Sequence, residues 1–283
     1  MFIGGRIKAL AVLVLLGLPG VAAAAPVPAL PELVRQTVVS ISTGGKVVGS
    51  GYLQSTDKWI YVISAKHVIQ PYMGSAVEVT FWAPQDTSAP STTLIDLPES
   101  AVDHSIFFST ADAVALRFGS FWGRGRGIVP ANVHPKSNIA GRSVPVIDGA
   151  MLVDMAEVAP TEDVVLVGYP SSLNNYMEPE NRFYDDTDPL FRRGMVAGKN
   201  RQRDFLIIDA AVLPGNSGGP VFVKRARDLF LAGIATDFVP SVSISKNERG
   251  VVTNVSVQNA GYTVVLPSDR IRELLLRADA VGN

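Results

Sequence analysis

The chain has 283 residues, of which 47% are hydrophobic and 18% are charged, and its formal net charge is −1. A chain of this length can bury a sizeable hydrophobic core. The near-neutral charge gives no reason to expect a nucleic acid or an anionic membrane surface as a partner. Disulfides are excluded because the chain has no cysteine, so its stability has to come from the core.

The first 24 residues have the pattern of a secretory signal peptide. Arg6 and Lys8 precede an apolar run over residues 9–18, and small residues follow it. The run is too short to span a bilayer comfortably, since that takes about 20 apolar residues. We expect cleavage after Ala24, with one residue to either side as the alternatives and an uncleaved anchor as the less favoured interpretation. The sequence therefore predicts an exported bacterial protein, periplasmic or extracellular, with no stable membrane anchor after cleavage.

Short stretches of alternating and β-branched residues follow, and Gly, Pro, Asp and Ser separate them. This pattern predicts an all-β barrel or sandwich. The strands expected in the first part are residues 34–42, 47–53, 59–64, 77–82, 92–97 and 114–118. Residues 126–149, rich in Gly and Pro, are expected to link two β-units. Arg124 and Arg126, around the start of this stretch, are expected to be solvated, and contact with a nucleic acid is the less favoured alternative.

The second part shows the same alternation. The strands expected there are residues 153–158, 163–168, 205–212, 220–223, 229–236 and 262–266. The polar stretch 171–203 is expected to be a loop, either at the border of a cleft or on the plain surface. Alternating residues 241–245 and 251–257 predict a hairpin. Residues 268–278 carry an apolar stripe at helical spacing, and Ser268 is the expected N-cap of a closing helix whose leucines are core.

The stretch that carries chemistry is Leu-Pro-Gly-Asn-Ser-Gly-Gly-Pro at residues 213–220. Its glycines leave the Ser217 hydroxyl uncrowded and allow backbone conformations that a Cβ forbids. In such a turn the amides of Gly215 and Ser217 can point at one spot beside the hydroxyl, as acyl-transfer chemistry requires. Taken alone, the motif also fits a plain turn between strands.

A serine nucleophile needs a base, and the chain has three histidines. His67 follows an apolar strand and is the favoured base, whereas His104 and His134 lie in polar contexts typical of solvated histidines. The base needs a carboxylate to orient it. Asp112 begins an apolar strand, where a buried carboxylate needs a hydrogen-bonded partner. Asp103 is the competing candidate.

These motifs, in the order His, Asp and Ser, resemble the chymotrypsin-fold (trypsin-like) serine peptidases. Segments 48–53, 164–170, 193–198 and 233–236 are similar to those of the bacterial HtrA/Deg-type proteases. The resemblance implies an all-β fold of two packed antiparallel six-stranded β-barrels with a C-terminal helix. The expected domains are the signal peptide 1–24, the N-terminal barrel 33–125, the linker 126–149, the C-terminal barrel 150–267 and the helix 268–280.

The resemblance also implies an activity, that of a serine endopeptidase acting on a peptide or protein substrate without a cofactor or metal. It makes Ser217 the nucleophile, His67 the base and Asp112 its orienting acid, with the amides of Gly215 and Ser217 as oxyanion donors. A non-catalytic peptide-binding protein of the same fold is the alternative, and an esterase is a third reading. The oligomeric state stays open.

Substrate contacts are implied in the same way. Ala235, Thr236 and Asp237 would belong to the edge strand that pairs with the substrate backbone, and Ala211 would lie at the base of the primary pocket. Since a methyl group cannot pair with a charged side chain, we expect an uncharged small or medium apolar residue before the cut. Two departures from the family's pattern stand out. Asn216 replaces the aspartate that pairs with a new N-terminus in pancreatic enzymes, and no PDZ domain is expected.

Overall fold

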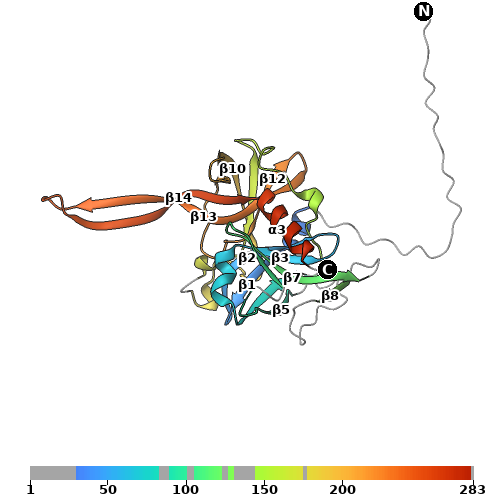
Figure 1. Cartoon of the computed structure of the whole chain (residues 1–283). Helices are drawn as coiled ribbons and strands as arrows, with labels where there is room; N and C mark the ends of the chain where they lie inside the picture. Colours follow the sequence, from blue (N-terminus) through green and yellow to red (C-terminus); the bar gives the residue numbers. More distant parts are fainter. Residues whose placement is uncertain are drawn as a thin grey trace, which may run out of the picture.

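The computed structural model describes residues 30–82, 89–100, 105–122, 127–130, 144–174 and 177–281. Two antiparallel β-sheets, one from each half of the chain, form its body, and a C-terminal helix, α3 (Ser268–Ala280), lies beside them (Figure 1). The predicted fold class is confirmed. Within the described residues, no helix combines the length and the apolar character needed to cross a bilayer. Several predictions fall outside the described residues: those on the signal peptide, Asp103, His104, Arg124, Arg126 and His134.

The first sheet has the strand order β5-β4-β1-β2-β3-β7-β6, and β8 also pairs with β7. Its strands are β1 (Val38–Thr43), β2 (Lys46–Ser55), β3 (Ile60–Ser64), β4 (Ala76–Phe81), β5 (Ser91–Asp96), β6 (Ile106–Phe108), β7 (Val114–Trp122) and β8 (Gly127–Pro130). It therefore has eight strands instead of the six expected. The short β6 and β8 make the difference, and β8 lies in the stretch expected to be a linker.

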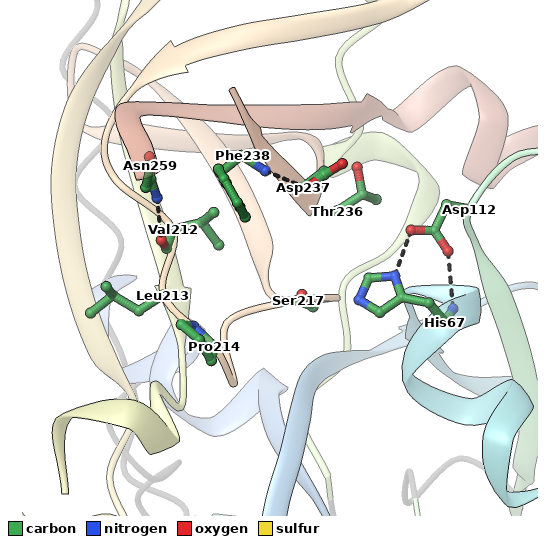
Figure 2. A pocket seen from close by; sticks show the side chains of 10 residues that line it. All are labelled: His67, Asp112, Val212, Leu213, Pro214, Ser217, Thr236, Asp237, Phe238 and Asn259. Atoms are coloured by element: carbon green, nitrogen blue, oxygen red, sulfur yellow. Dashed lines mark hydrogen bonds and ion pairs between the residues drawn. The ribbon is translucent and has the colours of Figure 1, made fainter. Parts of the chain in front are cut away.

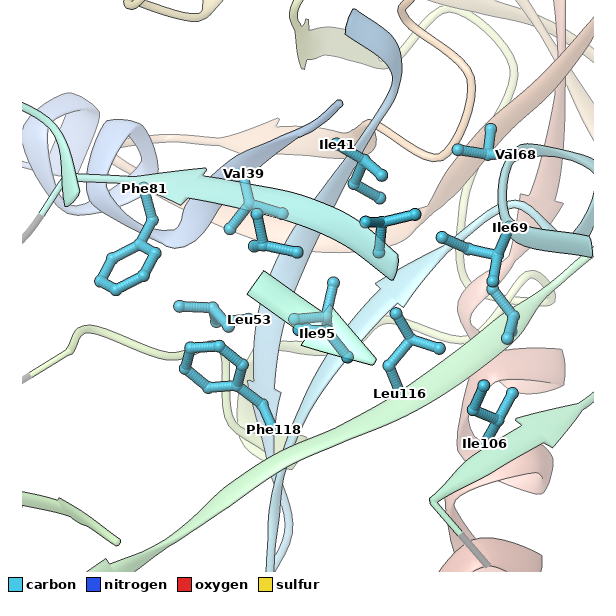
Figure 3. Close-up of a cluster of buried hydrophobic side chains, with 14 of the residues drawn as sticks. Val39, Ile41, Leu53, Val68, Ile69, Phe81, Ile95, Ile106, Leu116 and Phe118 are labelled. Carbon is cyan, nitrogen blue, oxygen red and sulfur yellow. The ribbon is translucent and has the colours of Figure 1, made fainter. Parts of the chain in front are cut away.

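The core of this sheet is apolar and well filled (Figure 3). Phe81 and Phe118 meet edge to face, with ring centroids 5.9 Å apart. Such aromatic pairs stabilise a fold by about 0.5–1.5 kcal/mol beyond the area they bury. This core holds rigid the strands that carry the site described below.

The second sheet is a closed six-stranded barrel with the order β10-β11-β14-β13-β12-β9. Its strands are β9 (Asp163–Gly168), β10 (Leu190–Asn200), β11 (Phe205–Asp209), β12 (Pro220–Arg225), β13 (Asp228–Lys246) and β14 (Val252–Pro267). Strand β10 corrects the prediction of a loop over 171–203. It pairs with β9 and β11 on its two edges, so its backbone is satisfied although its side chains are mostly polar or exposed.

Two further stretches differ from the predicted strands. Residues 153–158 form turns, because the Val153 and Met155 amides bond to the Leu231 carbonyl and the Asp269 carboxylate. The expected strand 34–42 begins only at Val38. Helix α1 (Leu30–Thr37) precedes it, with a hydrogen bond from Gln36 to Glu32 one turn earlier.

Helix α3 closes the molecule by packing on both halves, which is more than the predicted contact with the second barrel. A second apolar cluster joins Tyr61 and Ala115 of the first sheet, Phe222 of the second, and Leu274 and Leu275 of the helix. These helix leucines are buried, as predicted. Ser268 is not the N-cap, because its hydroxyl donates to the Val153 carbonyl and the capping position is Pro267.

Strands β13 and β14 run past the barrel and project from the body as a two-stranded ribbon (Figure 1). We call residues 240–259 the ribbon; its outermost pair is Lys246 with Val252. The ribbon agrees with the predicted hairpin and extends it toward the barrel. Its base lies beside the pocket described next.

Candidate active site

Strand pairing in the first sheet brings His67 and Asp112 together. His67 lies in the short helix α2 (Lys66–Ile69), which begins two residues after β3 ends. Asp112 lies two residues before β7 begins, and Ser64 at the end of β3 pairs with Val114 at the start of β7. The antiparallel register therefore places both side chains at the same edge of the sheet.

Both carboxylate oxygens of Asp112 contact His67. The Oδ2 atom lies 2.7 Å from the ring Nδ1, and Oδ1 accepts a hydrogen bond of 3.0 Å from the His67 backbone N–H (Figure 2). This double contact positions the ring, and Nε2 makes no hydrogen bond to the described part of the chain. In Figure 2 the ring extends from α2 toward Ser217.

The contact shifts both pKa values in opposite directions. The hydrogen bond to Asp112 is the main reason that the pKa of His67 is raised, and the negative charge of Asp237 raises it further. Burial alone would raise the pKa of Asp112, but the bonds from His67 outweigh it and leave that pKa lowered. The carboxylate is thus suited to stay ionised and to stabilise a positive imidazole.

Ser217 lies in a loop whose shape requires glycine on both sides. Gly215 has φ +97° and Gly218 has φ +84°, in the region that side chains disfavour. A Cβ at Gly218 would also lie 2.2 Å from the Ser50 carbonyl oxygen. The loop is held from the second barrel, because the Gly218 N–H donates to the Ala235 carbonyl over 2.7 Å.

The amides of Gly215 and Ser217 donate no hydrogen bond within the described part of the chain. The carbonyl before Gly215, that of Pro214, accepts from the Ser172 N–H at 3.4 Å. Since the peptide bond is trans, the Gly215 N–H points the opposite way, away from that turn. The Asn216 carbonyl accepts from Gly219 in the same manner and turns the Ser217 N–H away from it. Both donors are left available to a ligand.

His67, Asp112 and Ser217 share one pocket of about 480 Å³, and Gly215 is not among its lining residues (Figure 2). The lining residues are His67, Asp112, Val212, Leu213, Pro214, Ser217, Thr236, Asp237, Phe238 and Asn259. The pocket therefore joins side chains from both sheets. In the described structure, no group of three or more His, Cys, Asp or Glu side chains is placed to hold a metal ion.

The family model for the trypsin-like peptidase domain matches residues 49–230, a span that contains His67, Asp112 and Ser217. The chain belongs to the trypsin-like peptidase family. No curated protein matches this trypsin-like peptidase. Among solved structures it is similar to a serine endoprotease from Yersinia pestis, with 18% sequence identity and a TM-score of 0.48 over 91% of this chain and 70% of that one.

The pocket of this trypsin-like peptidase differs in part from the predicted substrate site. Of the four residues predicted to contact substrate, Thr236 and Asp237 line the pocket, whereas Ala211 and Ala235 do not. Ala235 is fully buried and bonded to the serine loop, and the Ala211 carbonyl accepts a hydrogen bond from Arg192.

Apolar groups take their place in the wall. The pocket is lined by Val212, Leu213, Pro214 and Phe238, and no role was predicted for any of these side chains. Phe238 directly follows Asp237, which was predicted to contact substrate, and this position next to the predicted edge strand was the available signal for Phe238. Asn259 had no signal, because it enters the site only through the fold of the ribbon base, where its Nδ2 donates to the Val212 carbonyl over 2.8 Å.

Ser50 is another residue whose role was not predicted from the sequence. It is fully buried in β2, and its hydroxyl donates to the Gly215 carbonyl over 2.7 Å. Its backbone N–H donates to the Ser217 carbonyl over 2.8 Å. The first sheet of the trypsin-like peptidase thereby fixes the serine loop of the second. The available signal was the pair of glycines around it, Gly49 and Gly51.

Proposed function

We propose that this protein is a serine endopeptidase that cleaves peptide bonds through an acyl-enzyme. The observation that carries the proposal is the pocket that the His67–Asp112 pair lines together with Ser217, whose loop also holds the unbonded amides of Gly215 and Ser217. No hydrogen bond joins Ser217 to His67 in the described structure. Such bonds are often long in a free enzyme and tighten when substrate binds.

The chemistry follows from these positions. Ser217 Oγ attacks the substrate carbonyl carbon while its proton passes to Nε2 of His67. Asp112 holds the ring and stabilises its positive charge. The amides of Gly215 and Ser217 bind the oxyanion. His67 then protonates the leaving amine, and a water molecule, deprotonated by the same ring, releases the acyl group from Ser217.

The substrate backbone is proposed to pair with β13. On one side β13 pairs with β12 only as far as Ile234, and beyond Ala235 no described strand covers that edge. Thr236 and Asp237 continue the edge into the pocket. Strand addition at a free edge is a common way to bind an extended peptide. The apolar lining supports an uncharged apolar residue before the cut, as expected from the sequence.

Labelling with a fluorophosphonate probe tests the proposal directly. The wild-type protein is expected to form a covalent adduct, because an activated serine attacks the probe's phosphorus. The Ser217→Ala variant is expected to form none. Ser243→Ala, at an exposed position of the ribbon, is the control and should label like the wild type. A folded wild-type protein that does not label would contradict the proposal and favour a non-catalytic peptide-binding protein.

The pH dependence supplies a second prediction. The reaction needs neutral His67, so kcat/KM should fall as the pH drops through the pKa of this ring. Asp237 raises that pKa, and the Asp237→Asn variant is therefore expected to move the acid limb of the kcat/KM profile to lower pH. Asp228→Asn, at the start of β13, should leave the limb in place. A limb that does not move would show that Asp237 does not act on His67.

Export of this endopeptidase in a bacterium is also proposed, and it rests on the residue pattern of the first 24 residues. The site itself has no bearing on it.

A further inference from the structure

The ribbon has two chemically different faces. Val242 pairs directly with Val257 and Ile244 with Val255, so four aliphatic side chains lie on one face. The pairs that alternate with them point to the other face and are polar but uncharged. They are Ser241 with Gln258, Ser243 with Ser256, and Ser245 with Asn254. A strict two-residue alternation on both strands produces this division.

The aliphatic face is uncovered along its length. Val242, Ile244, Val255 and Val257 are each 56–58% exposed, although aliphatic side chains are usually buried. A two-stranded hairpin alone is marginally stable, and a third strand or another layer against its apolar face is normally required. The ribbon projects away from the body, so the chain's own sheets do not supply that layer (Figure 1). No described part of the chain covers this face.

The peptide substrate is a poor candidate for this cover. The free edge of β13 that starts at Thr236 is interrupted at Pro240, which has no N–H to donate. The strand register also shifts between Phe238 and Pro240, which breaks the ladder at the base of the ribbon. The substrate edge therefore ends where the ribbon begins.

A second copy of the chain fits the surface better. In the paired part of the ribbon, Lys246 near the tip is the one charged side chain. The ribbon therefore offers no charges that would favour a partner of opposite charge. An uncharged aliphatic strip is complementary to itself, and a two-fold axis brings identical patches together in most homodimers. A second copy is also always present, unlike a substrate that is consumed.

We propose that the aliphatic face of the ribbon is a self-association surface. The ribbons of two copies pack face to face, each covering the four aliphatic side chains of the other, while the Ser, Asn and Gln face stays in water. The arrangement is a small two-layer β-sandwich formed between copies. This inference does not depend on the peptidase activity.

Crosslinking tests the proposal, because the chain has no cysteine of its own. An Ile244→Cys variant places one thiol on the aliphatic face, and a short bismaleimide linker is expected to join it to a second copy. Ser243→Cys places a thiol on the opposite face of the same strand and is the matched control, expected to give far less dimer. Equal crosslinking of the two variants would overturn the proposal.

Sedimentation gives an independent measurement. The wild-type protein is expected to have at least the mass of a dimer at micromolar concentration, and a Val242→Ser/Val257→Ser variant a lower mass. These side chains are exposed, so the variant should fold, and far-UV circular dichroism reports whether it has. A monomeric wild-type protein, or an oligomer whose mass the substitutions leave unchanged, would overturn the proposal. Unchanged mass with slower cleavage of unfolded proteins would assign the face to substrate instead.

Discussion

Asp112→Asn is expected to lower kcat on a peptide substrate about 10⁴-fold, the usual effect of replacing the orienting carboxylate of such a site. Both carboxylate oxygens accept hydrogen bonds from His67, one from the ring and one from the backbone. An amide keeps one oxygen, so its NH2 group has to face one of these donors. If it faces the ring, Nδ1 becomes an acceptor and the proton moves to Nε2. The ring then cannot take a proton from Ser217.

Steady-state kinetics on wild type and variant measure this effect. Asp96→Asn, an exposed carboxylate at the end of β5, is the control and should keep the wild-type rate. KM should change little, because Asp112 acts through His67 on the reacting atoms and the substrate's backbone contacts remain. A loss of less than tenfold would show that the carboxylate does not orient the base.

Gly218→Ala is expected to abolish activity and to lower the free energy of unfolding by about 3 kcal/mol, from the sum of a strained backbone and an overpacked site. The residue has φ +84°, and an added Cβ would lie 2.2 Å from the Ser50 carbonyl oxygen and 2.3 Å from the Ser64 hydroxyl. The first of these is backbone of the central strand β2 and cannot move aside alone. The serine loop would have to shift, and the two free amides would shift with it.

The chain offers a control that separates the two causes. Gly45, in the turn between β1 and β2, has φ +73° with no atom within 4 Å of an added Cβ. Gly45→Ala should therefore show only the backbone cost, about 1–2 kcal/mol, and keep its activity. Urea unfolding of both variants gives the comparison. Equal losses of stability would mean that the collision at Gly218 is relieved without cost.

The sequence predicted those features that depend on local pattern. Turn chemistry and apolar runs are local signals. They therefore revealed the glycines around Ser217, the strand that ends before His67 and the strand that begins after Asp112. Strand β10 was missed because its charged residues Arg192 and Arg193 are typical of a loop, whereas its pairing with β9 and β11 is determined only by the barrel. Tertiary pairing here outweighs local composition.

The site shows the same limit. Thr236 and Asp237 continue an apolar strand and line the pocket, but Phe238 in its wall lies between two register shifts in β13 that local sequence does not reveal. The positioning role of Ser50 was missed because its hydrogen bonds to Gly215 and Ser217 span more than 160 residues of chain.

The division of the site between two sheets has a consequence for the order in which a working enzyme comes into being. The half that is synthesised first carries His67 and Asp112 but no nucleophile, and Ser217 is held in place only when the later barrel has closed and Ser50 has docked on its loop. Under the proposed mechanism, an unfinished or half-folded copy is therefore inert toward neighbouring proteins, and hydrolysis begins only with the complete molecule.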